Sequence, residues 1–219
     1  MNEQPQKKTM VVGIVGGVAC GKSQVTQMLG DMGASVISAD KIAHDVLRLP
    51  DIVEALIQAF GVGILTDSSA GTARSEPTID RKKLGALVFG SQIDSNASQR
   101  RKLLESIVHP RIREIAKSQL ESMQALPSVN TIVLDAPLLI EGGWLPFCDK
   151  VIYVDAPDEL REAWAMRRGW SAEEFRNRES AQMSLAEKKK KATDVLQNVS
   201  DLNQLRIGLA QILDNWRGK

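Results

Sequence analysis

Residues 16–23, which read Gly-Gly-Val-Ala-Cys-Gly-Lys-Ser, constrain the fold of this chain more than any other segment. They match the pattern G-x-x-x-x-G-K-[ST] at every fixed position. Residues 10–15 before them form a nearly unbroken apolar run, which is typical of a strand buried on both faces of a parallel sheet. After Lys22, apolar residues recur at helical spacing until Gly33, where the helix is expected to end. A strand, a glycine-rich loop and a helix in this order predict an α/β fold with a phosphate-binding loop.

The chemistry of such a loop follows from its residue types. Glycines allow successive backbone N–H groups to curl around a polyphosphate, and the helix N-terminus adds partial positive charge. Lys22 is expected to reach the β- and γ-phosphates, and the Ser23 hydroxyl to bind Mg²⁺. The residues expected to bind the nucleotide are Gly16, Gly17, Val18, Ala19, Cys20, Gly21, Lys22, Ser23 and Gln24. The alternative is an ordinary glycine-rich turn between a strand and a helix.

The composition limits the class of protein less closely than the loop does. The 219 residues suit one α/β domain with insertions, or a core with a small lid. A net charge of +1 indicates no general attraction to nucleic acid or to a membrane. Cys20 and Cys148 are the only cysteines, too few for a disulfide framework. Residues 1–9 are polar and lack a signal-peptide core, so a frayed tail and a cytoplasmic location are expected. The sequence does not indicate an oligomeric state.

Strand and helix patterns alternate along the rest of the chain. Further strands are expected at residues 34–39, 131–134, 151–154 and 193–197. Helices are expected at about 41–47, 51–60, 158–168 and 201–216, with Asp51 as a possible N-cap. Residues 80–126 are helical almost throughout, with a break near 91–96 and Pro110 near the start of the last helix. Residues 61–78 are expected to form one long loop, and the lysine run 188–191 a solvated helix face.

Carboxylates and arginines indicate the class of reaction. Asp135 and Asp155 each follow an expected central strand, where ligands of open α/β sheets gather. Four arginines cluster around the Gly169-Trp170 turn: Arg167, Arg168, Arg176 and Arg178. The first two are expected to end one helix and the other two to begin the next. Such a helical hairpin could close over ATP. The alternative is a surface hairpin with scattered arginines. An Asn-Lys-x-Asp guanine-reading motif is absent from the sequence, which argues against a switch GTPase.

The loop with its flank, residues 13–23, is similar to the start of the dephospho-CoA kinase family. Residues 36–43 resemble its D-A-D-x-I-A segment, and residues 79–89 its L-D-R-x-x-L-x-x-x-V-F stretch. Residues 104–110 resemble its L-x-x-I-x-H-P element, residues 135–141 its D-x-P-L-L-x-E segment, and residues 181–183 its A-Q-M. The resemblance runs in order from residue 10 to about residue 216.

The resemblance implies a fold and an activity. The fold is a P-loop kinase fold, with a parallel central sheet, an inserted helical substrate domain and a helical lid. The expected kinase domain covers residues 10–216, after a disordered tail at 1–9. Its nucleotide core would be about 10–60, 128–160 and 193–216, its substrate domain about 61–127 and its lid about 161–192. The implied reaction uses ATP and Mg²⁺ to phosphorylate the ribose 3′-hydroxyl of dephospho-CoA, the last step of coenzyme A synthesis.

The resemblance also assigns residue roles. Asp40 matches the acidic residue near the accepting hydroxyl, as a base, and the alternative is a helix N-cap. Arg81 and His109 match positions of the substrate domain, and His109 is as often a structural residue in such a context. Asp135 is expected to hold Mg²⁺ through water. Two lid positions are matched, Arg167 as a catalytic arginine and Arg178 near the nucleotide. Glu141 could be an ion-pair partner within the domain, and no catalytic task is assigned to it.

The chain also departs from the family pattern. The family usually has Gly-Ser where this loop has Ala19-Cys20, so Ala19 either avoids a glycine-type conformation or is strained. In the lid, Ala163 stands at a commonly basic position and Arg168 at a commonly acidic one, so Arg168 is hypothesised to compensate. Cys20 lies beside Lys22, so it is either a reactive thiolate or a small space-filling residue.

Two other functions stay open at this point. One is a kinase for another small metabolite, such as a nucleoside monophosphate. The other is a nucleotide-dependent regulatory or scaffold protein, which would require the acid and the lid to be inactive.

Overall fold

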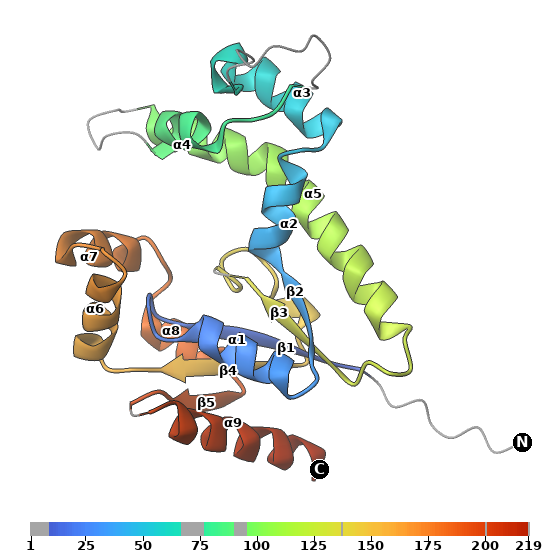
Figure 1. Ribbon diagram of the computed structural model, residues 1–219, viewed down its shortest axis with the longest axis vertical. Helices are drawn as coiled ribbons and strands as arrows, with labels where there is room; N and C mark the ends of the chain where they lie inside the picture. Colours follow the sequence, from blue (N-terminus) through green and yellow to red (C-terminus); the bar gives the residue numbers. More distant parts are fainter. Residues whose placement is uncertain (1–8, 67–76, 90–95, 137, 200, 219) are drawn as a thin grey trace, which may run out of the picture. The chain divides into compact units, whose positions relative to one another are not determined.

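The computed structural model describes residues 9–66, 77–89, 96–136, 138–199 and 201–218 (Figure 1). Its strands are β1 (Met10–Gly16), β2 (Ser35–Ser38), β3 (Thr131–Asp135), β4 (Lys150–Asp155) and β5 (Asp194–Gln197). All neighbouring strands are parallel, in the order β2-β3-β1-β4-β5. The predicted α/β fold with a parallel sheet is therefore confirmed, and each expected strand is present within two residues of its expected ends.

The helices follow the sequence pattern with a few differences. The α-helices are α1 (Lys22–Asp31), α2 (Ala39–Val46), α3 (Pro50–Phe60), α4 (Arg81–Phe89), α5 (Ala97–Gln124), α6 (Asp158–Arg167), α7 (Ala172–Ser180), α8 (Leu185–Lys190) and α9 (Leu202–Arg217). Two short 3-10 helices are η1 (Val62–Ile64) and η2 (Leu145–Phe147). No helix among the described residues is both long enough and apolar enough to cross a bilayer.

The chain forms two compact units. One consists of the chain up to Ala39 and from Gln119 onward, and the other is Asp40–Ser118. The first unit contains the sheet, the phosphate loop (residues 16–23) and helices α1 and α6 to α9. The sequence-based division counts residues 40–60 with the nucleotide core, whereas here they lie with the second unit. The functional division into core, substrate domain and lid stays a prediction.

The core of the first unit explains the apolar strands. Val12 and Ile14 of β1, Ile152 and Val154 of β4 and Leu196 of β5 pack with apolar residues of α1 and α9. The alternate residues of the central strands are buried as well; they include Val11, Val15, Ile132, Leu134, Val151 and Tyr153. Burial on both faces is why these strands read as continuous apolar runs.

The second unit is helical. Its buried residues include Ile52, Val53 and Leu56 of α3, Ile64 of η1, and Leu84 and Val88 of α4. Leu65 and Ile79 form an antiparallel bridge, so the loop expected at 61–78 contains η1 and this pairing at its ends. Residues 67–76 of that loop lie outside the described residues.

Three sequence-based expectations about helices are wrong. Asp51 is not the N-cap of α3, because the helix begins at Pro50 after Leu49, and proline suits a first helical position where its missing N–H is not needed. Pro110 lies inside the single 28-residue helix α5, where burial of Ile112 and Ala116 helps to offset its cost. The expected break at 91–96 falls almost wholly outside the described residues, between the end of α4 and the start of α5.

The third correction concerns the lysine run. Lys188 is only 2% exposed, so residues 188–191 are not a uniformly solvated face. Its Nζ donates to Gln182 Oε1 at 2.7 Å and lies 3.1 Å from Glu141 Oε1. Lys189 is ion-paired with Asp155 at 2.8 Å. A run of like charges gave no sign that its first member is buried and has a carboxylate partner.

Candidate active site

The phosphate loop has a tightly constrained backbone. Gly21, the N-cap of α1, has φ 100°, and Ala19 has φ 57°. Within the described parts of the chain, Ala19 is the only residue other than glycine with positive φ. The left-handed conformation costs an alanine roughly 1–2 kcal/mol. Of the two alternatives for Ala19, the structure supports strain.

Two glycines of the loop are required by close neighbours. A Cβ on Gly17 would lie 2.4 Å from Nη1 of Arg161, and a Cβ on Gly21 would lie 2.4 Å from Nδ2 of Asn198. Both contacts are too short for any side chain. Arg161 and Asn198 therefore pack directly on the loop backbone.

The Lys22 side chain lies along the loop. Its Nζ donates to the carbonyl oxygens of Gly17 at 2.7 Å and Gly16 at 3.2 Å. The ammonium group is thus held within the loop, as expected of a lysine that binds the β- and γ-phosphates.

The charge of Asp135 affects the pKa of Lys22. Burial lowers the pKa of Lys22, the cations Lys188 and Arg161 lower it further, and the Asp135 carboxylate opposes this. Asp135 ends β3 and Ser23 lies in the first turn of α1. A carboxylate and a hydroxyl are oxygen ligands of the kind that Mg²⁺ prefers. The charge of Lys22 and the oxygens of Asp135 and Ser23 fit a magnesium–nucleotide complex. In the described ranges, no group of three or more His, Cys, Asp or Glu residues could form a metal site from protein ligands alone.

A pocket of about 720 Å³ adjoins the phosphate loop. Its walls come from the loop and α1, from the end of α6, and from the turn between β5 and α9; the lining residues are Ala19, Gly21, Gln24, Trp164, Arg167, Arg168, Asn198, Asp201, Leu202 and Asn203. The volume is within the usual range for small-molecule sites. The structure therefore brings the predicted lid arginines Arg167 and Arg168 to one pocket with the predicted nucleotide residues.

Arg178 is placed differently. It lies in the last turn of α7, because that helix begins at Ala172, and so it does not begin the helix as expected. Its guanidinium lies over the Trp170 ring at 4.1 Å, and its Nε and Nη2 donate to Glu174 at 3.2 and 2.7 Å. Arg178 does not line the pocket described above. Its contact with a nucleotide stays a prediction.

The remaining site candidates belong to the second unit. Asp40 is the second residue of α2, so it is not the N-cap of that helix. In the chain it follows Ser38 by two residues, and Ser38 pairs in register with Asp135. Arg81 is the exposed first residue of α4, and His109 is an exposed residue of α5.

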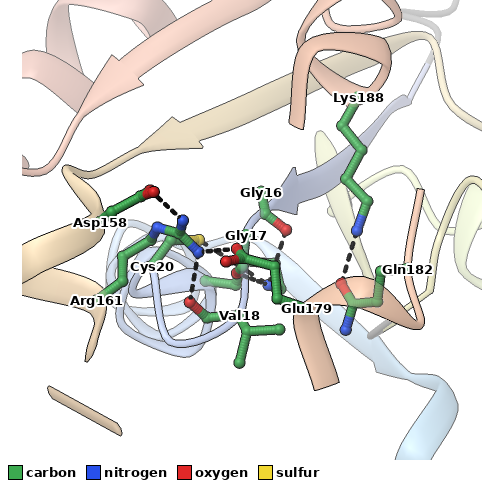
Figure 2. A network of polar contacts seen from close by, with 10 residues as sticks. Gly16, Gly17, Val18, Cys20, Asp158, Arg161, Glu179, Gln182 and Lys188 are labelled. Carbon is green, nitrogen blue, oxygen red and sulfur yellow. Dashed lines mark hydrogen bonds and ion pairs between the residues drawn. The ribbon is translucent and has the colours of Figure 1, made fainter. Parts of the chain in front are cut away.

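Sequence reasoning missed two buried polar residues that contact the phosphate loop, Arg161 and Asn198. Arg161 is 1% exposed and donates to the carbonyl oxygen of Val18 at 3.3 Å (Figure 2). Asn198 is also buried and donates from Nδ2 to the carbonyl oxygen of Cys20 at 2.9 Å. Asn198 directly follows β5, at the carboxyl edge of the sheet where ligand residues gather, and this signal could have identified it. Arg161 had no comparable signal.

Glu141 is an ion-pair partner, as expected. Besides Lys188, its Oε1 accepts a hydrogen bond from the backbone N–H of Met183 at 3.0 Å. The ion pair joins the segment after β3 to α8, and the hydrogen bond from Met183 joins it to the turn before α8. Two segments that carried the family resemblance, 135–141 and 181–183, therefore meet in space.

Cys20 lies in the apolar core. It is 1% exposed and packs with residues of β1, β4 and α1. Lys22 Nζ lies 3.9 Å from its sulfur. This burial supports the interpretation of Cys20 as a space-filling residue.

Comparison with known proteins decides the family. The model of the dephospho-CoA kinase family matches residues 10–204. This chain belongs to the dephospho-CoA kinase family. The dephospho-CoA kinase of Geobacillus kaustophilus is 38% identical over 210 residues, covering 95% of this chain and 97% of the relative. That of Bacillus licheniformis is 37% identical over 212 residues, covering 95% and 97%.

Solved structures agree with this family assignment. The crystal structure of TT1252 from Thermus thermophilus has a TM-score of 0.75 at 32% identity and covers 95% of this chain and 98% of its own. A dephospho-CoA kinase from Campylobacter jejuni has a TM-score of 0.65 at 28% identity, with coverages of 93% and 95%. The similarity to the family thus includes the fold as well as the sequence.

Proposed function

We propose that this chain transfers the γ-phosphoryl group of ATP to the ribose 3′-hydroxyl of dephospho-CoA, giving coenzyme A and ADP. The match of residues 10–204 to the family model carries this proposal. The geometry supports it, because one pocket combines the phosphate loop with two arginines. Phosphoryl transfer depends mainly on positioning and charge stabilisation, and these are the properties that such a pocket supplies.

Residues of the first unit bind and activate ATP. Backbone N–H groups of residues 16–24 and the Lys22 ammonium hold the β- and γ-phosphates. Arg167, at the end of α6, stabilises the charge of the transferring group, and Arg168 adds to it from the same pocket. The walls around Trp164 and Asn198 receive the rest of the nucleotide.

Magnesium is the metal that suits the side-chain oxygens of Ser23 and Asp135. Ser23 would hold it directly and Asp135 through water, while the ion neutralises charge on the phosphates when it is bound. Two observations support the choice of Ser23 and Asp135: both have side-chain oxygens, and Asp135 acts electrostatically on Lys22.

The acceptor side of the reaction is assigned to the second unit. Asp40 orients the 3′-hydroxyl and takes its proton, and Arg81 and His109 bind dephospho-CoA. The position of Asp40, two residues after a strand that pairs with β3, supports its role near the carboxyl edge of the sheet. Residues 161–192 act as the lid, and Arg178 reaches the nucleotide from it.

The test is an acceptor panel. The purified chain is incubated with ATP, Mg²⁺ and one acceptor at a time (dephospho-CoA, AMP, CMP or UMP), and products are identified by mass. A gain of one phosphate on dephospho-CoA alone is the expected result. Phosphorylation of a nucleoside monophosphate would instead support a nucleotide kinase, and ATP binding without any product a regulatory or scaffold protein. Lys22→Ala serves as the inactive control, because it removes the cation that binds the phosphates.

A further inference from the structure

Arg161 is a buried cation in the first half of α6. Its side chain is 1% exposed and forms ion pairs with two carboxylates, Asp158 and Glu179. Asp158 begins the same helix and is 75% exposed, whereas Glu179 belongs to the last turn of α7 and is 28% exposed. The guanidinium also lies 5.5 Å from the centre of the Phe175 ring of α7. Arg161 therefore connects the two helices of the α6–α7 hairpin.

The same guanidinium contacts the phosphate loop. Nη1 donates to the carbonyl oxygen of Val18 at 3.3 Å and lies where a side chain on Gly17 would begin. In Figure 2, dashed lines join the Arg161 guanidinium to Asp158, to Glu179 and to the Val18 carbonyl, and Glu179 lies beside the loop residues. One nitrogen thus binds both a loop carbonyl and the α7 carboxylate.

This arrangement is unusual for a residue that only fills the core. A buried ion pair can often be replaced by apolar residues of similar volume without loss of stability. A planar guanidinium, however, fixes the directions of several acceptors at once, which an apolar side chain cannot do. The position of the loop backbone at Gly17 and Val18 is therefore tied to the position of α7.

We propose that Arg161 is a positioning residue that couples the α6–α7 hairpin to the phosphate loop. When Glu179 holds the guanidinium in place, the Val18 carbonyl and the neighbouring loop N–H groups keep the geometry that binds the phosphates. The proposal rests on the proposed function, because it concerns the nucleotide site of that reaction. It adds a residue that acts on ATP through the loop without touching ATP.

The test separates positioning from stability. The double variant Arg161→Met/Glu179→Met removes the Arg161–Glu179 pair as a whole. Asp158 also loses its partner, but its side chain is 75% exposed, so water solvates the carboxylate. Arg161→Lys keeps the charge but cannot bind all three acceptors. Arg206→Gln is the matched control, because it removes an exposed arginine whose ion pair with Asp31 lies elsewhere in the same unit. Thermal unfolding, ADP affinity by calorimetry, and kcat and KM for both substrates are measured for each.

We expect the double variant to unfold within a few degrees of the parent while its affinity for ADP falls roughly tenfold or more. Its kcat/KM for ATP falls by a similar factor, and KM for dephospho-CoA stays within twofold. Arg161→Lys shows an intermediate loss of ADP affinity, and Arg206→Gln shows none. ADP affinity and kcat/KM for ATP within twofold of the parent in the double variant would overturn the proposal. If the double variant does not fold, Arg161→Lys decides by the same criterion.

The ADP measurement also keeps this proposal distinct from the proposed function. It requires no acceptor, so it reports on the coupling even if the parent chain does not phosphorylate dephospho-CoA. Absence of that product with the parent chain contradicts the proposed function, whereas unchanged ADP affinity in the variants contradicts the coupling.

Discussion

The side-chain amide of Asn198 donates a hydrogen bond to the backbone carbonyl of Cys20 at 2.9 Å, across 178 positions of the chain. Asn198 is 4% exposed, and its backbone N–H donates to the carbonyl of Asp155 at 2.7 Å. The bond fixes the turn after β5 against the phosphate loop. Asn198 also lines the pocket, so the bond links two walls of that pocket.

Asn198→Asp tests this link. The substitution keeps the shape but places a carboxylate oxygen against the Cys20 carbonyl, and it adds negative charge beside the predicted phosphate site. An unpaired buried acceptor costs about 1–3 kcal/mol, so ADP affinity should fall by roughly 5- to 150-fold. Calorimetry with ADP measures the change, and Asn215→Asp on the exposed side of α9 is the matched control. An unchanged affinity in Asn198→Asp would show that the bond does not support the loop.

Asp40→Asn tests the base. The change removes the proton acceptor and keeps the size, so turnover should fall about a hundred- to ten-thousandfold while ATP affinity changes little. Since Asp40 lies in the first turn of α2 and is not its N-cap, unfolding temperature should change only slightly. Steady-state kinetics with dephospho-CoA gives the answer. Turnover near the parent rate would mean that another residue is the base.

Arg167→Ala and Arg168→Ala test the pocket arginines. Both side chains line the pocket beside the phosphate loop. Arg167→Ala should lower turnover on the order of a hundredfold or more, because a cation on the transferring group is lost. Arg168→Ala should cause a smaller loss of turnover and weaken ATP use. If kcat and KM for ATP are both unchanged in Arg168→Ala, Arg168 does not compensate for Ala163.

Glu141→Gln tests the buried pair with Lys188. Although burial raises the pKa of Glu141, hydrogen bonds from its own backbone, from Met183 and from Lys188 lower it on balance. A folded-state pKa below the ordinary 4.5 contributes stability that is present above pH 4.5 and lost as pH falls through the folded-state value. Glu141→Gln should therefore unfold several degrees below the parent at pH 7, and this difference should shrink below about pH 4.

Thermal unfolding between pH 3 and pH 7 measures this pH dependence. Glu159→Gln, an exposed change in the first turn of α6, is the control and should differ little from the parent at any pH. A difference for Glu141→Gln that persists unchanged at pH 3 would assign the effect to packing instead of charge.

The two cysteines should react slowly in the folded protein. Burial and the nearby Asp149 raise the pKa of Cys148 to about 12, so only about one thiol in ten thousand is ionised at pH 8. Cys20 is 1% exposed in the core. Alkylation followed by peptide mapping should label both sites rapidly in urea and slowly in buffer. Rapid labelling of Cys20 in buffer, slowed by ATP and Mg²⁺, would restore the hypothesis of a reactive loop cysteine.

Local sequence patterns predicted the presence of the strands and helices well, and the residues at which they begin and end less well. The apolar run of residues 10–15 and the glycine pattern after it are short-range signals, and β1 and α1 follow them closely. The start of α3 and the continuity of α5 through Pro110 were missed. For α3, the preference of proline for the first helical position was overlooked. For α5, the local cost of Pro110 was weighed without the packing around the helix.

The phosphate loop, the parallel α/β fold and the family could be predicted without a structure, because each depends on residues that are close in the chain or on segments in a recognisable order. Only the tertiary structure decided which charges are buried. Lys188 was expected in solvent and is paired with Glu141, and Arg161 pairs with Glu179 and contacts Val18, 143 positions away. A charged residue is stable inside a protein only where its partner is also placed, and that placement depends on how distant segments fold together.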